Sequence, residues 1–134
     1  VLNKDENVKF FNYVNYSKIP KILSKYSVAL MPYQNKVKGR GSIYLQKYMS
    51  PLKMFDYMAA KMIIIASNLG VYKHILKNNF NCKLVEVNKD DEWSNAIQSS
   101  FENTTKNKYL KKNAYKTVQK YTWDKRCKSI VNFF

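Results

Sequence analysis

The apolar residues of this chain fall in short runs whose spacing changes from one segment to the next. Residues 27–32 (SVALMP) and 62–67 (MIIIAS) are almost continuously apolar, which is typical of strands buried on both faces of a parallel sheet. Residues 82–87 (CKLVEV) predict a further strand. Residues 8–14 (VKFFNYV) are rich in β-branched and aromatic side chains, and they predict a strand near the start of the chain.

Segments with helical spacing alternate with these strands. They cover residues 17–26, a stretch that begins at 51, residues 70–78, two stretches between 91 and 120, and the closing stretch from 122. Strands that alternate with helices indicate an α/β fold with a parallel sheet. Because 134 residues suffice for one modest core, we expect a single domain over residues 1–134.

Residues 33–49 show no regular spacing, and they hold two of the three glycines of the chain. A loop of this length inside a compact domain is usually functional or disordered. Gly39 and Gly41 fit a flexible lid near a ligand, and they fit an ordinary loop equally well.

The stretch 50–67 (SPLKMFDYMAAKMIIIAS) carries the clearest chemical signal. Ser50 is a good N-cap, and Pro51 suits the first position of a helix. The free backbone N–H groups of Leu52 and Lys53 would then point outward at the positive end of the helix dipole. In an open parallel sheet, ligands gather where strands end and such helices begin. This helix start is therefore a candidate phosphate site.

Asp56 lies one turn further along, on the same helical face as Lys53. Lys53 opposes the helix dipole, so its position is unfavourable unless an anion binds. A carboxylate at Asp56 can accept hydrogen bonds from ribose hydroxyls, and a nucleoside diphosphate fits this arrangement. We expect Leu52, Phe55 and Ala59 to form the buried stripe. The alternative is an ordinary capped helix with a surface pair of Lys53 and Asp56.

The charge of the chain raises a second hypothesis. Lys and Arg number 24 against nine Asp and Glu, a formal net charge of +15 that suits nucleic acid, an anionic membrane or phosphorylated substrates. Arg is preferred for bidentate contacts with phosphate and guanine, yet it occurs only as Arg40 and Arg126. Dedicated nucleic-acid binding is therefore disfavoured. A non-catalytic basic module that binds nucleotide or nucleic acid stays the alternative function.

Other residues favour a cytosolic protein. No apolar run approaches the ~20 residues of a membrane span, and the polar start gives no signal peptide. Cys82 and Cys127 lie far apart without metal-ligand spacing, so we expect both to be reduced core residues. His74 fits a plain helical position, and Trp93 and Trp123, at helix starts, fit packing anchors.

Five segments, in order along the chain, resemble the C-terminal, donor-binding domain of GT-B glycosyltransferases of the retaining group 1 type, family 4. These are VKFFNYVNYSKIPKIL, YSVALMPY, SPLKMFDYMAAKMIIIAS, NNFNCKLVEVNKDDEWSNAI and NAYKTVQKYTWDKR. SPLK with its following aromatic-acid-aromatic-Met-Ala run resembles a variant of the donor motif of the family. The resemblance implies a Rossmann-like sheet and retaining transfer of a hexose from a nucleoside diphosphate sugar, in polysaccharide biosynthesis.

Roles for single residues are implied by the same resemblance. The helix start, here Ser50, Leu52 and Lys53, would bind the donor diphosphate, and Asp56 would bind ribose. The helix dipole, the amides and Lys53 could stabilise the leaving diphosphate without a metal, so we expect no metal and no other cofactor. The sequence identifies no catalytic residue.

The turn after the first strand, here Tyr13 and Val14, would contact the nucleobase through its backbone.

Three positions depart from the family. Asp56 stands where the family usually has Glu, and its carboxylate reaches one methylene less. Tyr48 stands where many relatives have a second Glu, and Asn12 where a Gly is common.

The sheet of the family has the strand order 3-2-1-4-5-6, and strand 8–14 resembles its third strand. The first two strands and the N-terminal acceptor domain have no counterpart, so we expect a fragment of a longer enzyme that is inactive alone. Strand 8–14 should lie two places from strand 27–32, which leaves a gap between them in the sheet. Strands from the rest of a longer polypeptide or from another copy of the chain could fill this gap. Alternatively, an altered strand order could close it. Expected partners are a nucleoside diphosphate sugar, the missing domain, and an anionic membrane surface or lipid-linked acceptor.

Overall fold

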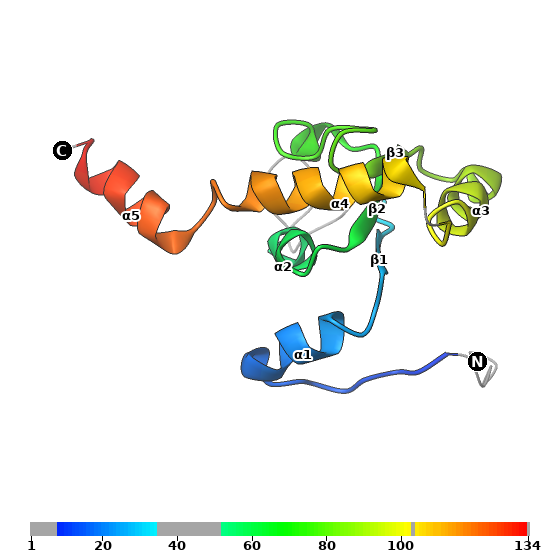
Figure 1. The fold of residues 1–134 in the computed structure, drawn as a ribbon, viewed down its shortest axis with the longest axis horizontal. Coiled ribbons are helices and arrows are strands. Elements are labelled where there is room, and N and C mark those ends of the chain that lie inside the picture. The colour runs from blue at the N-terminus through cyan, green and yellow to red at the C-terminus, as the bar shows by residue number, and fades with distance from the viewer. Residues whose placement is uncertain (1–7, 35–51, 103, 134) are drawn as a thin grey trace, which may run out of the picture.

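The computed structural model describes residues 8–34, 52–102 and 104–133, and helices alternate with strands along them (Figure 1). The elements are η1 (Tyr16–Lys18), α1 (Ile19–Leu23), β1 (Val28–Met31), α2 (Lys53–Ala59), β2 (Ile63–Ser67), η4 (Gly70–Tyr72), β3 (Lys83–Val85), α3 (Asp90–Gln98), α4 (Thr105–Val118) and α5 (Trp123–Val131). The two η elements are single 3-10 turns. No helix in these ranges is long and apolar enough to cross a membrane.

A parallel sheet of three strands forms the centre of the described structure. Its order is β1-β2-β3, with Val28 opposite Ile63 in one pair and Ile65 opposite Lys83 in the other. All five residues of β2 are buried, as the continuous apolar run predicts. The predicted α/β fold with a parallel sheet is therefore confirmed, as are the strands expected in 27–32, 62–67 and 82–87.

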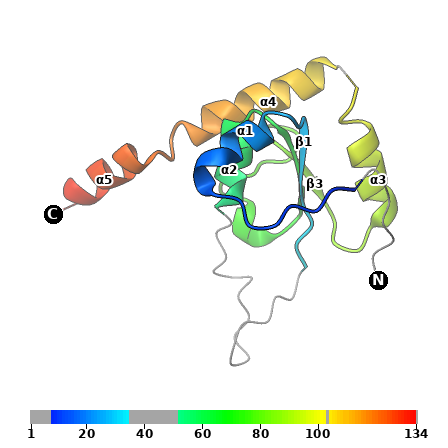
Figure 2. The same ribbon diagram turned by 90° about the horizontal axis from the view of Figure 1, so that it is seen from below.

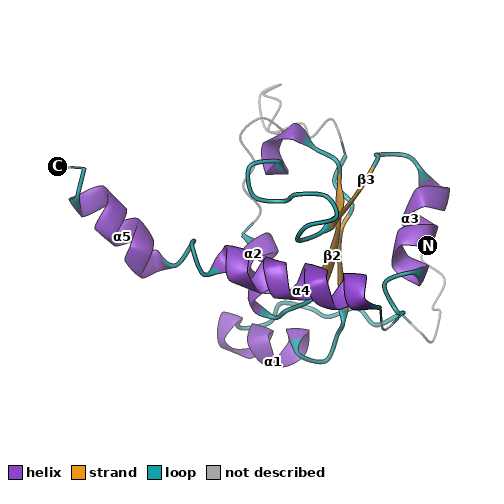
Figure 3. Ribbon diagram, turned by 45° about the horizontal axis from the view of Figure 1, so that its top comes forward, coloured by secondary structure: helices purple, strands orange, loops and turns teal. Residues whose placement is uncertain are grey.

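Two helices share the core with the sheet. Helix α4 lies across the strands and contacts α2 and β2 (Figure 3). Met54 and Met58 of α2 meet Ala114 and Val118 of α4 in one buried cluster that also contains Ile64. This packing fixes α2 beside the sheet.

The buried face of α2 differs from the one that the sequence predicts. Met54 and Met58 are buried, whereas Leu52 is 71% exposed and Ala59 is exposed too. Phe55 is half-buried and packs on the periphery of the core. The unbranched methionines, spaced one turn apart, fill the space between α2, α4 and the sheet. The predicted stripe was wrong because only Phe55 of its three members turns toward the core.

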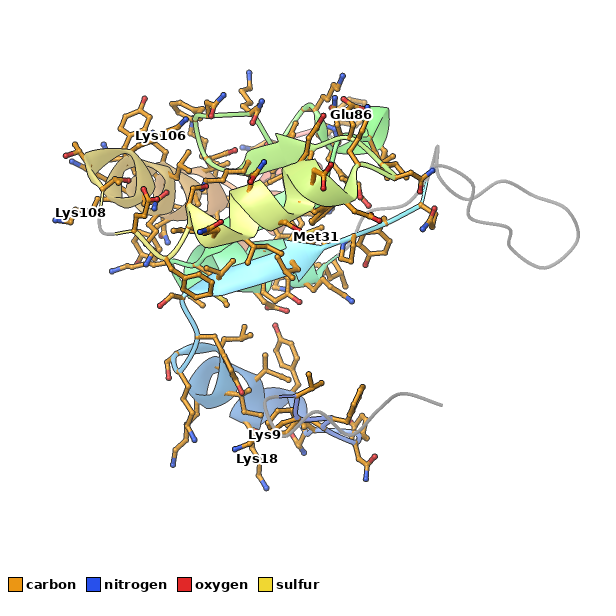
Figure 4. All side chains as sticks on the ribbon, turned by 90° about the vertical axis from the view of Figure 1, so that its right-hand side faces the viewer. Lys9, Lys18, Met31, Glu86, Lys106 and Lys108 are labelled. Atoms are coloured by element: carbon orange, nitrogen blue, oxygen red, sulfur yellow. The ribbon has the colours of Figure 1, made fainter. Side chains whose placement is uncertain are left out.

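Residues 8–14 do not form a strand. Residues 8–15 have neither helical nor strand structure, and their side chains are largely exposed, with Tyr13 at 94%. Figure 4 shows Lys9 and Lys18 pointing away from the sheet, in which Met31 lies. The predicted strand was wrong because β propensity reflects packing against a neighbouring strand, and this segment has none among the described residues. The prediction that this segment lies two strands away from β1 in the sheet was therefore wrong as well.

Strand β1 is consequently an edge of the sheet in the part of the chain that the structure describes. It pairs with β2 on one side. Leu30, in the middle of β1, is 44% exposed. Its backbone partner in β2 is Ile65, which is buried. The two neighbouring strands therefore differ in burial although both read as apolar runs.

The predicted helix at 70–78 is reduced to the 3-10 turn η4 followed by turns. Asn81 accepts from the backbone N–H of Lys77 at 2.8 Å and donates to the Ile75 carbonyl at 2.9 Å, which replaces helical bonds. Asn79 has a positive φ of 58°, which also ends any helix. His74 is exposed in this segment. Most of the predicted loop, from 35 to 49, lies outside the described residues, so its role as a lid stays a prediction.

For the cysteines and for the tryptophans, the prediction was right for one residue and wrong for the other. Cys82 is buried and reduced as predicted, and burial raises its pKa from 9.0 to about 12. Cys127 is free but exposed, so its predicted place in the core was wrong. Trp93 is half-buried and its indole Nε1 donates to the Glu86 carbonyl at 3.2 Å, whereas Trp123 is 78% exposed and anchors no packing. Both misplaced residues belong to α5, which extends away from the sheet (Figures 1 and 3).

Candidate functional site

The carboxyl ends of β1 and β2 lie together because the two strands are parallel neighbours. They end at Met31 and Ser67, and the Ser67 hydroxyl donates to the Met31 carbonyl at 3.4 Å. Tyr33 follows β1 closely, and η4 follows β2. Glu86, just after β3, lies at this end of the molecule in Figure 4, whereas Lys106 and Lys108 lie at the other. This carboxyl edge is where ligands bind in open α/β sheets.

Lys53 begins α2 at the carboxyl edge. Its Nζ lies 5.8 Å from the ring centroid of Tyr33, within the range of a cation–π contact. The Tyr33 ring in turn meets the ring of Tyr72 in η4 edge-on, with centroids 6.2 Å apart. The contacts of these three residues join the start of α2 to the segments after β1 and β2. The structure therefore puts an exposed cation at the ends of both strands.

The first turn of α2 is the place of the predicted phosphate site, which stays a prediction. Leu52 is the N-cap residue, and no side-chain cap bond is found for it among the described residues. Its carbonyl accepts from the Phe55 N–H at 2.9 Å, so the helical turn closes around this start. Ser50, the predicted N-cap, lies outside the described residues, as does Pro51.

Asp56 lies on α2 and is half-buried. Its Oδ1 accepts a hydrogen bond from the Tyr16 hydroxyl at 3.0 Å. This bond to Asp56, followed by the charge of the carboxylate, raises the pKa of Tyr16 above 10.0. Since Tyr16 follows Tyr13 and Val14 closely, the contact brings the predicted nucleobase segment toward the predicted ribose ligand. Figure 2 shows η1 and α1 on the same side of the molecule as α2.

Lys53 and Asp56 make separate contacts, one to Tyr33 and one to Tyr16. They are therefore not held together as the simple surface pair that the sequence left open. The tyrosines are the part of the site that sequence reasoning missed. The sequence does contain one feature that could have indicated Tyr33 and Tyr72. Each of them follows the carboxyl end of an apolar strand by a few residues.

A hollow of about 340 Å³ adjoins the same edge next to β2. Its lining consists of Asn68, Lys73, Leu76, Lys77, Asn78 and Leu84. Asn68 follows β2 directly, and its Nδ2 donates to the Glu86 side chain. Lys53 and Asp56 do not line this hollow.

The fold defines the class of the protein: an α/β domain with a parallel sheet that matches part of the C-terminal domain of GT-B enzymes. Residues 2–117 match the family described as "Glycosyl transferases group 1". The chain belongs to this family, as the resemblance of the five segments predicted. Comparison with curated protein sequences gave no significant match.

Three solved structures share the fold. Sucrose-phosphate synthase from Thermosynechococcus elongatus superposes with a TM-score of 0.78 at 19% identity, over 98% of this chain and 30% of that one. The C-terminal domain of the group 1 protein LpcC from Francisella tularensis superposes with a TM-score of 0.64 at 18% identity, over 85% of this chain and 53% of that one. Anabaena Alr3699/HepE, solved in complex with UDP-glucose, superposes with a TM-score of 0.63 at 13% identity, over 87% of this chain and 30% of that one. This chain thus spans 30% of two of these solved chains and 53% of the third, which is itself a C-terminal domain.

Proposed function

We propose that this chain is the donor-binding part of a retaining hexosyltransferase that uses a nucleoside diphosphate sugar. Membership of the group 1 family supports the class of reaction. The similarity of the fold to a protein solved with UDP-glucose supports the class of donor. The observation that carries the proposal is the position of Lys53, which begins α2 and lies against Tyr33 at the carboxyl edge.

The diphosphate would bind at the start of α2. Here the backbone N–H groups of Leu52 and Lys53 and the ammonium of Lys53 supply positive charge, and Ser50 would complete the SPLK-type motif. When the bond between the anomeric carbon and the phosphate oxygen breaks, the diphosphate takes the electron pair. Positive groups that are already in place stabilise this charge, which lowers the barrier. The acceptor hydroxyl oxygen forms the new bond on the same face of the sugar, and its proton passes to the departing phosphate oxygen.

The nucleoside would extend from there along α2. Asp56 would accept hydrogen bonds from the ribose hydroxyls, and the backbone of Tyr13 and Val14 would contact the base. Support comes from the bond between Tyr16 and Asp56, which brings the segment after Val14 to α2. The ribose hydroxyls would take the place of the Tyr16 hydroxyl on the carboxylate.

Transfer needs a second domain that binds the acceptor. The solved structures are longer than this chain, which covers 30% of the sucrose-phosphate synthase chain. Trp123 and Val131 of α5 and Leu30 of β1 expose apolar surface that such a domain would cover. An anionic membrane surface or a lipid-linked acceptor stays a further prediction, which the basic residues of α5, Lys125, Arg126 and Lys128, would suit. Alone, the chain should bind donor without transfer.

The test compares two lysines of α2. Lys53→Gln removes the charge at the helix start while it keeps most of the stem. Lys61→Gln is the matched control, because Lys61 follows the other end of α2 and also lies over an aromatic ring, that of Tyr115, at 4.6 Å. Binding of UDP, GDP, ADP and the corresponding nucleosides is measured by calorimetry. We expect Lys53→Gln to lower the affinity for the preferred diphosphate about tenfold, with nucleoside binding unchanged.

Equal losses for nucleoside and nucleoside diphosphate would contradict the assignment of Lys53, and so would equal losses in the two variants. Absence of binding of all three diphosphates by the unmodified chain would contradict the proposed function. The alternative, a nucleic-acid-binding module, is favoured by the exposed Phe10, Phe11 and Tyr13 in a basic chain. It predicts affinity for single strands that falls steeply with salt, and no preference for one base.

A further inference from the structure

Two buried side-chain polar atoms lack a hydrogen-bond partner among the described residues, namely the Tyr72 hydroxyl and Asn68 Oδ1. Unpaired buried groups are rare in native proteins, and each calls for an explanation. Both residues belong to the short segment that follows β2 at the carboxyl edge. The unpaired atoms are therefore concentrated where an α/β sheet binds its ligand.

Tyr72 is the stronger of the two. Its side chain is 1% exposed and belongs to the core, whereas Asn68 is half-buried and its amide donates to Glu86. Burial raises the pKa of Tyr72 to about 12, so the hydroxyl is a neutral donor at physiological pH. A phenylalanine would fill the same space without an unpaired oxygen. The Tyr72 hydroxyl thus makes no hydrogen bond that stabilises the described part of the fold.

The surroundings of Tyr72 indicate the kind of acceptor. Its ring meets that of Tyr33, and the Tyr33 ring carries the ammonium of Lys53 at 5.8 Å. Tyr33 is half-buried and packs at the periphery of the core, so it is the described aromatic side chain between Tyr72 and the exposed cation. A group that binds to the Lys53 ammonium therefore lies near the Tyr33 ring. Such a group is an anion, and a neutral phenol makes its strongest hydrogen bonds to anionic oxygens.

We propose that the Tyr72 hydroxyl is a donor-binding group that completes its hydrogen bond on a diphosphate oxygen of the nucleotide sugar, next to Lys53. The inference rests on the proposed function and adds a residue to it. The Tyr33 ring contacts both the Tyr72 ring and the Lys53 ammonium. Binding of the diphosphate draws Lys53 off this ring, and rotation of Tyr33 gives the ligand access to Tyr72.

The test uses Tyr72→Phe in the same 134-residue chain. Calorimetry measures the affinity for the preferred nucleoside diphosphate, for inorganic pyrophosphate and for the nucleoside, and urea unfolding measures the stability of the free protein. We expect the affinities for diphosphate and pyrophosphate to fall about tenfold, with no change for the nucleoside. The free variant should be as stable as the unmodified chain or more so. Tyr109→Phe, an exposed tyrosine on α4, is the control.

Two results would overturn the inference while leaving the proposed function intact. One is diphosphate affinity within twofold of the unmodified chain. The other is a loss of stability in the free Tyr72→Phe variant, because the hydroxyl would then have a partner within the protein. If the unmodified chain binds no diphosphate, the proposed function fails, and this inference fails with it.

Discussion

The hydroxyl of Tyr16 donates a hydrogen bond to Oδ1 of Asp56 over 3.0 Å, and this bond joins the turn before α1 to α2. The two residues are 40 positions apart in the sequence. A carboxylate that already accepts one hydroxyl has the orientation and environment to accept others. The bond therefore gives a geometric reason to test Asp56 as the ribose ligand.

The first prediction concerns the ribose. Asp56→Ala should abolish the preference for UDP over 2′,3′-dideoxy-UDP, because the charged acceptor for the ribose hydroxyls is lost. We expect a preference of about tenfold in the unmodified chain and none in the variant, measured by calorimetry. Tyr16→Phe removes the hydroxyl that competes for the same carboxylate, and it should retain the preference. A preference that survives in Asp56→Ala would assign ribose recognition to another residue.

The second prediction concerns the buried face of α2. Met58 is fully buried, so Met58→Ala should lower the free energy of unfolding by about 2–5 kcal/mol. Leu52→Ala, on the exposed side, should change it by less than about 0.5 kcal/mol. Urea denaturation followed by circular dichroism measures both. The reverse order of the two effects would restore the stripe that the sequence predicts.

The third prediction concerns pH. The folded chain keeps the proton of Cys82 up to about pH 12, whereas the unfolded chain releases it near 9.0. Stability from this group is therefore complete below pH 9 and declines as the pH rises from 9 toward 12. Compared with the unmodified chain, Cys82→Ala should lose stability less steeply in this window, by up to about 1.4 kcal/mol per pH unit. Parallel curves for the two proteins would show that burial does not shift this pKa.

The fourth prediction uses the other thiol. Cys127 is exposed on α5, so a disulfide reagent should modify it in the native protein within seconds to minutes. Cys82 should react only after urea unfolds the chain. Cys127→Ser serves as the control, because it should leave no thiol that reacts under native conditions. Modification of both thiols in the native state would contradict the buried position of Cys82.

The strands β1, β2 and β3 could be predicted because long apolar runs are typical of a parallel sheet that is covered on its faces. The segment 8–14 has the same residue types and no neighbouring strand among the described residues, so its local propensity gave the wrong result. At the start of α2, the N-cap residue Leu52 and the helical residue Met54 are both apolar. Only the packing of α4 against the methionines decides which of them is buried. Sequence spacing does not contain that information.

The candidate site shows the same limit. Lys53 and Asp56 stand out in the sequence because their spacing on one helix is local. Tyr16 reaches Asp56 across 40 residues, and Tyr72 and Tyr33 meet from two different strand ends. These contacts depend on the order of the strands in the sheet. A single sequence could locate the helix start but not the aromatic residues around it.

Among the described residues β1 has a neighbouring strand on one side alone, and this has a consequence for how the isolated chain behaves in solution. An edge strand with an exposed apolar residue, here Leu30, is a template on which another chain can add a strand. The net charge of +15 makes copies of the chain repel one another, and the Debye length of about 10 Å at 0.1 M salt limits the range of that repulsion. We therefore expect ionic strength to control any self-association through β1. We expect the chain to stay dispersed in dilute buffer and to associate through this strand when salt is added.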